Sequence, residues 1–143
     1  MLENPLHVVS SFLELKFVGM LLDHGASVNV EAFGGWTPLQ RALDSLYNSN
    51  ADCFSVAKLL VERGADVNAR DKDHETPLHF AVDFVWASWA SGHLELKLVA
   101  MLLDHGAQVN VEGNQGRTPL HNASGYKSFN TCIDEEHFDV VQL

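Results

Sequence analysis

One phrase is written three times along this chain, and it limits the possible folds more than any other feature of the sequence. It reads VGMLLDHGASVNVE at 18–31, AKLLVERGADVNAR at 57–70 and VAMLLDHGAQVNVE at 99–112. The central glycine of the phrase recurs after 39 and then 42 residues, as Gly25, Gly64 and Gly106. Self-similarity at a period of roughly 20 to 50 residues indicates a protein built from stacked repeats.

A second phrase keeps step with the first. It reads TPLQRA at 37–42, TPLHFA at 76–81 and TPLHNA at 118–123, with a degenerate NPLHVV at 4–9. The Thr hydroxyl before Pro can accept a hydrogen bond from the first free helical N–H groups, and Pro lacks the N–H that would go unused at the next position. Each TPL therefore predicts the start of a helix.

The first phrase predicts the end of another helix. Its leucines belong to apolar stripes at helical spacing, and each glycine stands where a left-handed C-terminal cap is favoured. His24, Arg63 and His105 precede these glycines and suit the negative end of the helix dipole. The residues that follow, such as ASVNV, predict short extended turns or β-hairpins leading to the next TPL.

Together these motifs, TPLH and GADVN above all, resemble the ankyrin repeat family. The resemblance covers almost the whole chain and implies an all-α solenoid of about four helix-turn-helix repeats. Short hairpin loops would join the repeats, and extended loops or helices would lie between the paired helices. We expect a single domain over residues 1–143, with repeats at 1–33, 34–72, 73–114 and 115–143, the last of them truncated.

Composition narrows the function. The 143 residues are 46% hydrophobic and 20% charged, which predicts one globular unit with a packed core. A formal net charge of -10 argues against nucleic-acid and anionic-membrane partners. Charges interrupt the apolar N-terminal stretch before a signal peptide or membrane span could form. Cys53 and Cys132 do not suggest a disulfide framework, so we expect an intracellular, cytoplasmic protein.

The histidines of the second phrase could be mistaken for a metal site. His7, His79 and His121 occupy equivalent places, but stacked helices are about 10 Å apart, whereas zinc ligands lie within about 2.1 Å of the metal. In ankyrin-like repeats this His ties the turn together by hydrogen bonds, and Gln40 should keep part of that bonding in the second repeat. The sequence also lacks a nucleophile elbow, a phosphate-binding glycine run and an HExxH pair. We therefore expect no metal, no cofactor and no enzymatic activity.

Asparagine ends each GxxVN word, as Asn29, Asn68 and Asn110. Because Asn readily bonds to nearby backbone, we expect these side chains to stabilise the hairpins. The resemblance adds that ankyrin-like proteins can be substrates of an asparaginyl hydroxylase at this position. The sequence permits that modification at any of the three residues without selecting one.

The spacing between the two phrases departs from the family. Pro5 to Gly25 is 20 residues, but Pro38 to Gly64 is 26 and Pro77 to Gly106 is 29, so six and nine extra residues separate the paired helices. The stretch 43–55 has a loop composition, and Ser55 could cap the next helix. The stretch 82–96 has no helix breaker before Gly92, which predicts that the first helix of the third repeat continues for about two turns.

Two tryptophans lie in that extension, and two readings of them remain open. Trp86 and Trp89 could pack on the neighbouring spacers, as aromatic stripes usually do. Alternatively, they could form an exposed apolar patch that recruits a partner. His74 is a further departure, because the other turns have Gly35 and Gly116 at that place; His tolerates the left-handed conformation better than bulky residues do.

The segments 13–31 and 94–112 differ at only three positions, 17/98, 19/100 and 27/108. Duplication of a block of two repeats is the simplest explanation, and it favours a scaffold over an active site. The sequence stops inside the expected second helix of the fourth repeat. It is then either a piece of a longer repeat protein or a chain closed by a short capping helix.

Stacked repeats leave a concave side that packing does not constrain. The resemblance places the variable residues at the hairpin tips, before each TPL, and seven and eight places after each Thr. We predict a monomeric, non-catalytic module that binds another protein, with aromatic anchors inside a charged rim. The residues predicted to contact the partner are Phe12, Phe33, Trp36, Asp44, Lys72, Glu75, Asp83, Phe84, Asn114, Arg117 and Tyr126. The alternative is a structural or regulatory ankyrin segment of a larger, multidomain protein.

Overall fold

The computed structural model describes residue 5 and residues 15–44, 53–83 and 94–124. The described elements are α2 (Leu15–Asp23), α3 (Pro38–Asp44), α4 (Cys53–Glu62), α5 (Pro77–Asp83), α6 (Leu94–Asp104), the 3-10 turn η3 (Asn114–Gly116) and α7 (Pro119–Ala123). These residues contain no strand, so the connections are hairpin-shaped turns and not β-hairpins. The predicted all-helical repeat architecture is confirmed.

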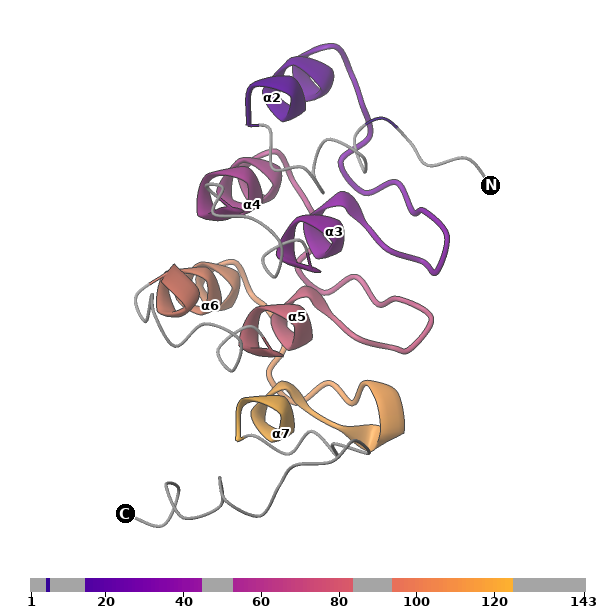
Figure 1. Cartoon of the computed structure of the whole chain (residues 1–143), viewed down its shortest axis with the longest axis vertical. Coiled ribbons are helices and arrows are strands. Elements are labelled where there is room, and N and C mark those ends of the chain that lie inside the picture. Colours follow the sequence, from indigo (N-terminus) through magenta and orange to yellow (C-terminus); the bar gives the residue numbers. More distant parts are fainter. Residues whose placement is uncertain (1–4, 6–14, 45–52, 84–93, 125–143) are drawn as a thin grey trace, which may run out of the picture.

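The helices form two rows (Figure 1). One row contains α3, α5 and α7, and the other contains α2, α4 and α6. Within the rows, α3 packs on α5 and α5 on α7, while α2 packs on α4 and α4 on α6. Across the rows, α3 contacts α4 and α5 contacts α6. The turns that lead into α3, α5 and α7 all project to the same side, next to the α3–α5–α7 row.

The TPL phrases begin helices as predicted. Helices α3, α5 and α7 start at Pro38, Pro77 and Pro119, directly after a threonine. Thr118 shows the capping geometry: its side chain accepts a hydrogen bond from the backbone N–H of His121. The proposed Ser55 cap was wrong, because α4 already begins at Cys53. The earlier start gives α4 three additional residues, most of a turn, and Phe54 among them packs against the core.

The glycines end the other row of helices as predicted. Gly25, Gly64 and Gly106 have φ angles of 89°, 90° and 87°. In each case the glycine N–H bonds to the carbonyl three residues back, and the N–H of the following alanine bonds to the carbonyl five residues back. This pair of bonds is the Schellman arrangement, which satisfies the last free carbonyls of a helix.

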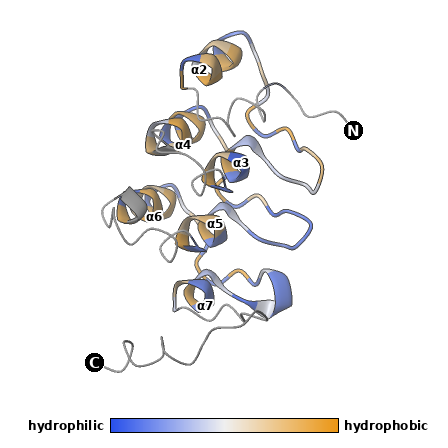
Figure 2. Ribbon diagram, in the orientation of Figure 1, coloured by the Kyte–Doolittle hydropathy of each residue, from blue (hydrophilic) through white to orange (hydrophobic). Residues whose placement is uncertain are grey.

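Leucines from both rows make up the centre of the core. Leu39, Leu43, Leu60, Leu98 and Leu102 are all less than 2% exposed. Figure 2 shows hydrophobic colouring on the helices and mainly hydrophilic colouring on the loops before α5 and α7, whereas the loop before α3 is partly hydrophobic. Complete burial of each such side chain contributes about 1.5–3 kcal/mol, more than any single loop contact, so packing of the two rows positions the loops.

Several expectations fall on residues outside the described part. They are the extension of α5 through 84–93 with Trp86 and Trp89, the loop composition of 45–52, and the second helix of the fourth repeat. Among the described helices, α6 is the longest at 11 residues. A bilayer requires about 20 apolar residues, so no described helix could cross one.

Candidate partner-binding surface

The hairpin loops repeat one geometry. The backbone N–H groups of Ala32, Asp71 and Gly113 bond to the carbonyls of the residues four places later, at 2.9, 3.1 and 2.8 Å. The turn of the third repeat keeps this form without glycine, because His74 adopts a φ of 62°. The Asp71 carboxylate supports that turn, since its Oδ1 accepts from the N–H groups of Asp73 and Glu75, both at 2.9 Å.

His79 joins two consecutive repeats. Its Nδ1 accepts from the Thr76 N–H at 3.0 Å, and its Nε2 therefore carries the proton and donates to the Arg117 carbonyl at 3.0 Å. The side chain is completely buried. Burial lowers the pKa of His79 below its usual 6.5, and this outweighs the opposite effects of the Arg117 carbonyl and of nearby Asp83 and Asp71.

Gln40 performs the same task in the second repeat. Its Oε1 accepts from the Thr37 N–H at 2.8 Å, and its Nε2 donates to the carbonyls of Ala69 and Glu75 at 3.2 and 3.0 Å. The amide thus keeps the bond to the threonine N–H and the bond to the next repeat, while the contact of His79 Nδ1 with the Thr76 hydroxyl has no counterpart at Gln40. In α7, Nδ1 of His121 again accepts from the Thr118 N–H, at 3.1 Å. Both described histidines of this phrase therefore use Nδ1 locally, as the structural interpretation predicts.

The asparagines have a different role from the one expected. Asn29 donates to the Gly64 carbonyl at 3.1 Å and accepts from the Asp66 N–H at 2.7 Å. Asn68 reaches Gly106 and Gln108 in the same way, at 3.0 and 2.8 Å. For Asn29 and Asn68, the prediction that the side chain bonds within its own hairpin was wrong. The glycine turn of the next repeat stacks directly against them and offers a free carbonyl and N–H.

Eight of the eleven predicted contact residues are described, and they lie in three rows. The tips of the loops carry Phe33, Lys72 and Asn114, all exposed; the residues before each TPL are Trp36, Glu75 and Arg117, all partly buried; and α3 and α5 end in partly buried Asp44 and Asp83. We call the side formed by the hairpin loops and the α3–α5–α7 row the groove face. Phe12, Phe84 and Tyr126 lie outside the described residues.

Neighbouring aromatic rings and cationic side chains determine how much of Phe33 and Trp36 remains exposed. Phe33 is 78% exposed, with the Lys72 ammonium 4.3 Å from its ring centroid. Trp36 is more enclosed, because Phe80 meets it edge to face with ring centroids 5.2 Å apart and the Arg41 guanidinium lies 5.4 Å from its ring. The Trp36 ring is therefore packed against Phe80 and Arg41, whereas the Phe33 ring is largely exposed.

Sequence reasoning missed Arg41 and Phe80. Both stand one residue after the His or Gln of the TPL phrase, and the equivalent residue in α7 is Asn122. The sequence feature that could have identified them is the variation of residue type at an otherwise regular position of the repeat.

Burial raises the pKa of the Asp44 carboxyl above its usual 3.8, although Arg41 acts in the opposite direction.

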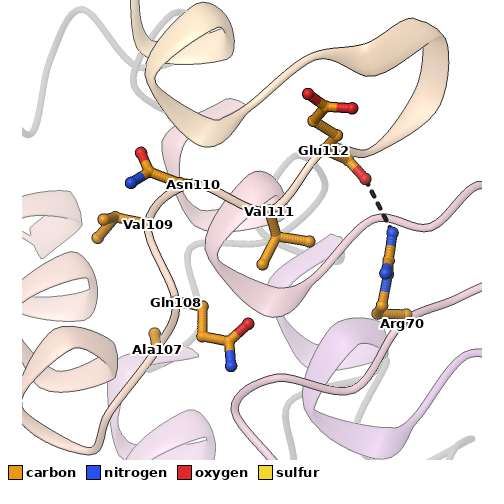
Figure 3. A pocket seen from close by; sticks show the side chains of 7 residues that line it. All are labelled: Arg70, Ala107, Gln108, Val109, Asn110, Val111 and Glu112. Atoms are coloured by element: carbon orange, nitrogen blue, oxygen red, sulfur yellow. Dashed lines mark hydrogen bonds between the residues drawn. The ribbon is translucent and has the colours of Figure 1, made fainter.

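Two open hollows lie among the loops. One, of about 460 Å³, is bounded by Glu31, Ala32, Phe33, Gly34, Gly35, Arg70, Asp71 and Lys72. The other, of about 730 Å³, is bounded by Arg70 and residues 107–112, and there Arg70 Nη2 donates to the Glu112 carbonyl at 2.9 Å (Figure 3). Within the described ranges, His, Cys, Asp and Glu side chains nowhere gather in threes that could hold a metal ion.

Comparison with known proteins agrees with this geometry. The profile of ankyrin repeats (3 copies) matches residues 2–71 and 47–142. The chain is 47% identical over 53 residues to mouse fibronectin type 3 and ankyrin repeat domains 1 protein, covering 37% of this chain and 14% of that protein. It is 44% identical over 61 residues to zebrafish protein fem-1 homolog A, covering 38% and 10%. It is 41% identical over 54 residues to human ankyrin repeat and SOCS box protein 10, covering 33% and 12%.

The chain thus spans only a small part of these relatives. The profile, in contrast, matches nearly its full length, and the capped helix pairs and left-handed glycine turns recur at the spacing of the matched motifs. On these grounds the chain belongs to the ankyrin repeat family.

Proposed function

We propose that the chain is a non-catalytic module that binds another protein through the groove face. Ankyrin repeats generally mediate protein–protein interaction, and the family is generally non-catalytic. The observation that supports the groove face best is the alignment of its variable side chains. Equivalent positions of successive loops carry Phe33, Lys72 and Asn114 outward, on turns held together by bonds such as Lys72 N–H to the Gly34 carbonyl at 2.9 Å. A rigid loop array loses little conformational entropy on binding.

The partner should present a basic segment with apolar side chains. The chain carries a net charge of -10, and the predicted contact residues include the carboxylates of Asp44, Glu75 and Asp83, all partly buried. Aromatic side chains within a charged rim are typical of residues that dominate protein-binding energy. Exposed Phe33 and the half-buried ring of Trp36 would cover the apolar part of the partner, and the carboxylates would steer its basic residues. We also propose that the protein is cytoplasmic, because its two cysteines do not suggest a disulfide framework. We propose in addition that it is a monomer.

The test begins by introducing a photoactivatable cross-linker in place of Phe33 and, as a matched control, in place of Lys58. Lys58 is on α4, forms an exposed pair with Glu62 at 3.8 Å and lies off the groove face. A protein captured from position 33 but not from position 58 is then purified. Its affinity is measured by calorimetry for the wild type, Phe33→Ser, Trp36→Ala and Lys58→Ala.

Loss of a residue that dominates binding costs about 2 kcal/mol, which corresponds to about 30-fold weaker affinity. We expect that loss for Phe33→Ser or Trp36→Ala and less than about two-fold for Lys58→Ala. Because Trp36 supports Phe80, its variant must first melt at a temperature close to that of the wild type. Unchanged affinity in both groove-face variants would reject this face as the binding site.

A second candidate function is that of a structural or regulatory segment of a larger protein. The observation that favours it is the coverage, since the chain spans 14%, 10% and 12% of the three relatives named above. Further repeats encoded in frame after Leu143 would support this role. A partner that binds the isolated chain as tightly as the longer protein would argue for the first proposal.

A further inference from the structure

The Trp36 ring on the groove face contacts two groups of different mobility. Phe80 meets the ring edge to face, with the ring centroids 5.2 Å apart, and Phe80 itself packs against the hydrophobic core. The Arg41 guanidinium lies 5.4 Å from the centroid of the Trp36 ring, at the end of a long side chain. Trp36 and Arg41 are both partly exposed. Because exposed side chains change rotamer within nanoseconds, Arg41 is the group that can leave the ring while the fold stays intact.

The combination of Trp36 and Arg41 is specific to one repeat. The equivalent pairs in the next two repeats are Glu75 with Phe80 and Arg117 with Asn122. Neither of those pairs contains both a cation and an aromatic ring. The contact is therefore a property of this chain and not of the repeated motif, which suits a role in selecting a partner.

The tip of the same loop shows the same chemistry. The Lys72 ammonium lies 4.3 Å from the centroid of the Phe33 ring, which is 78% exposed. Each described aromatic residue that we predict to contact the partner thus has a cation of the chain itself at its ring. The face of an aromatic ring attracts a cation, and the attraction is stronger where water is excluded. A partner that covers the groove face would exclude water, so a cation that it brings to the Trp36 ring gains more than Arg41 gains in the unbound protein.

A carboxyl group near Arg41 favours a cation at this place. Asp44 stands three residues after Arg41 on α3 and is partly buried. Burial raises the pKa of Asp44, and the positive charge of Arg41 opposes that rise. If Arg41 turned away from the ring, the Asp44 carboxylate would lose a stabilising charge. A basic residue of the partner in the same place would restore that charge, whereas a neutral side chain would not.

We propose that the Trp36 ring is a cation-binding subsite of the groove face, which Arg41 occupies in the unbound protein and an arginine of the partner occupies in the complex. The proposal rests on the function proposed above and identifies the partner residue that meets Trp36. An arginine suits the ring better than a lysine, because its planar guanidinium stacks on aromatic faces and is more weakly hydrated. Arg41 then determines specificity, since it competes with the partner for the ring and only a second cation replaces its charge.

The probe is a fluorescently labelled peptide of alternating leucine and arginine, titrated with the full chain and followed by anisotropy. The matched control peptide carries citrulline, the neutral isostere of arginine, in place of each arginine. Arg41→Ala removes the competing cation, and Trp36→Leu removes the ring. Lys58→Ala is the control variant, because it also removes one positive charge but lies off the groove face.

We expect Arg41→Ala to bind the arginine peptide about three-fold more tightly than the wild type does, because a partly exposed cation–π contact no longer competes. Trp36→Leu should bind it about ten-fold more weakly. Lys58→Ala should bind it as the wild type does, because salt screens an exposed and distant charge. The citrulline peptide should bind Arg41→Ala no more tightly than the wild type. If Trp36→Leu does not fold, as its melting curve will show, the comparison of Arg41→Ala with Lys58→Ala still decides the question.

Three outcomes would overturn the proposal. Arg41→Ala could bind the arginine peptide equally or more weakly, which would mean that Arg41 does not compete for the ring. The citrulline peptide could gain as much as the arginine peptide, so that the gain would come from space and not from charge. In both cases, weaker binding by folded Trp36→Leu would still support the groove face as the binding surface. Finally, the wild type and Trp36→Leu could bind the arginine peptide equally or not at all, which would contradict this subsite and the proposed basic partner together.

Discussion

At the scale of single residues, the position that follows each TPL shows that an amide and an imidazole can make the same structural bonds. This position is occupied by Gln40, His79 and His121. Gln40 and His79 are both fully buried, and each accepts a bond from the threonine N–H and donates to a carbonyl of the next repeat. An amide cannot take up a proton in the physiological range, whereas an imidazole can. The two repeats therefore respond differently to acid.

His79→Gln should remove part of the pH dependence of stability. Because burial lowers the pKa of folded His79 below 6.5, the unfolded chain binds more protons between that pKa and about 6.5. The free energy of unfolding is then highest above pH 6.5 and decreases as the pH falls towards the folded pKa. Urea unfolding at pH 7.5 and 5.5 should show a smaller difference for His79→Gln than for the wild type.

The reverse substitution is the control for this prediction. Gln40→His introduces a second buried imidazole in the same setting and should enlarge the difference between the two pH values. Equal differences in the wild type and His79→Gln would show that protonation of His79 does not govern acid stability.

At the scale of elements, the helices depend on their ends and on packing. The described α-helices are 5 to 11 residues long, and isolated helices shorter than about 12 residues are marginal in water. Threonine caps and left-handed glycines therefore determine where each helix begins and ends. Burial of one face against the other row then stabilises it.

Two glycine-to-alanine substitutions should have opposite effects. Gly64 has a φ of 90°, and no atom lies within 4 Å of the place that a Cβ would occupy, so Gly64→Ala should cost about 1–2 kcal/mol through backbone strain alone. Gly19 lies inside α2, where a Cβ would meet only Leu59 Cδ2 at 3.8 Å. Gly19→Ala should stabilise the protein by up to about 1 kcal/mol, and the duplicated segment already has Ala100 at this position. Urea unfolding measures both; the same sign for both would contradict the assignment of Gly64 as a cap.

At the scale of the whole molecule, contacts join neighbouring repeats. In each row of described helices the main contacts join successive helices. The side chains of Asn29, Asn68, Gln40 and His79 bond across the same junctions. In such a quasi-one-dimensional molecule, stability is roughly a sum of repeat and junction terms. A side chain that bonds across a junction should therefore contribute more to the free energy of unfolding than an equivalent side chain without such a bond.

Asn68→Ala and Asn110→Ala test this difference, because both remove the same side chain from equivalent positions of the motif. Asn68 makes two hydrogen bonds to the next repeat, so Asn68→Ala should lower the free energy of unfolding by about 1 kcal/mol. The loss is small because water can replace the side chain at this exposed site. The Asn110 side chain makes no hydrogen bond to described residues, so Asn110→Ala should leave the free energy of unfolding unchanged. Chemical unfolding of both variants provides the comparison; equal losses would argue against a junction role for Asn68.

Local patterns of residues were sufficient to predict the repeat, the helix starts at TPL, the left-handed glycine turns and the family. These features depend on chemistry within a few positions: a threonine oxygen beside free N–H groups, a proline without N–H, and a glycine without Cβ. His74 marks the limit of such prediction. Its φ of 62° depends on support from the Asp71 carboxylate, which the pattern of the other two turns does not indicate.

Which groups meet across a junction, in contrast, became clear only from the packed repeats. Asn29 resembles a hairpin residue in sequence, yet it bonds to Gly64, 35 residues away. Trp36 has the sequence position of an exposed anchor, yet Phe80 of the next repeat encloses it. Leu39 and Leu120 stand in the same motif, yet one is buried and the other exposed. For Asn29 and Trp36 the outcome depends on the neighbouring repeat that lies against the residue, and a local pattern of amino acids carries no information about that neighbour.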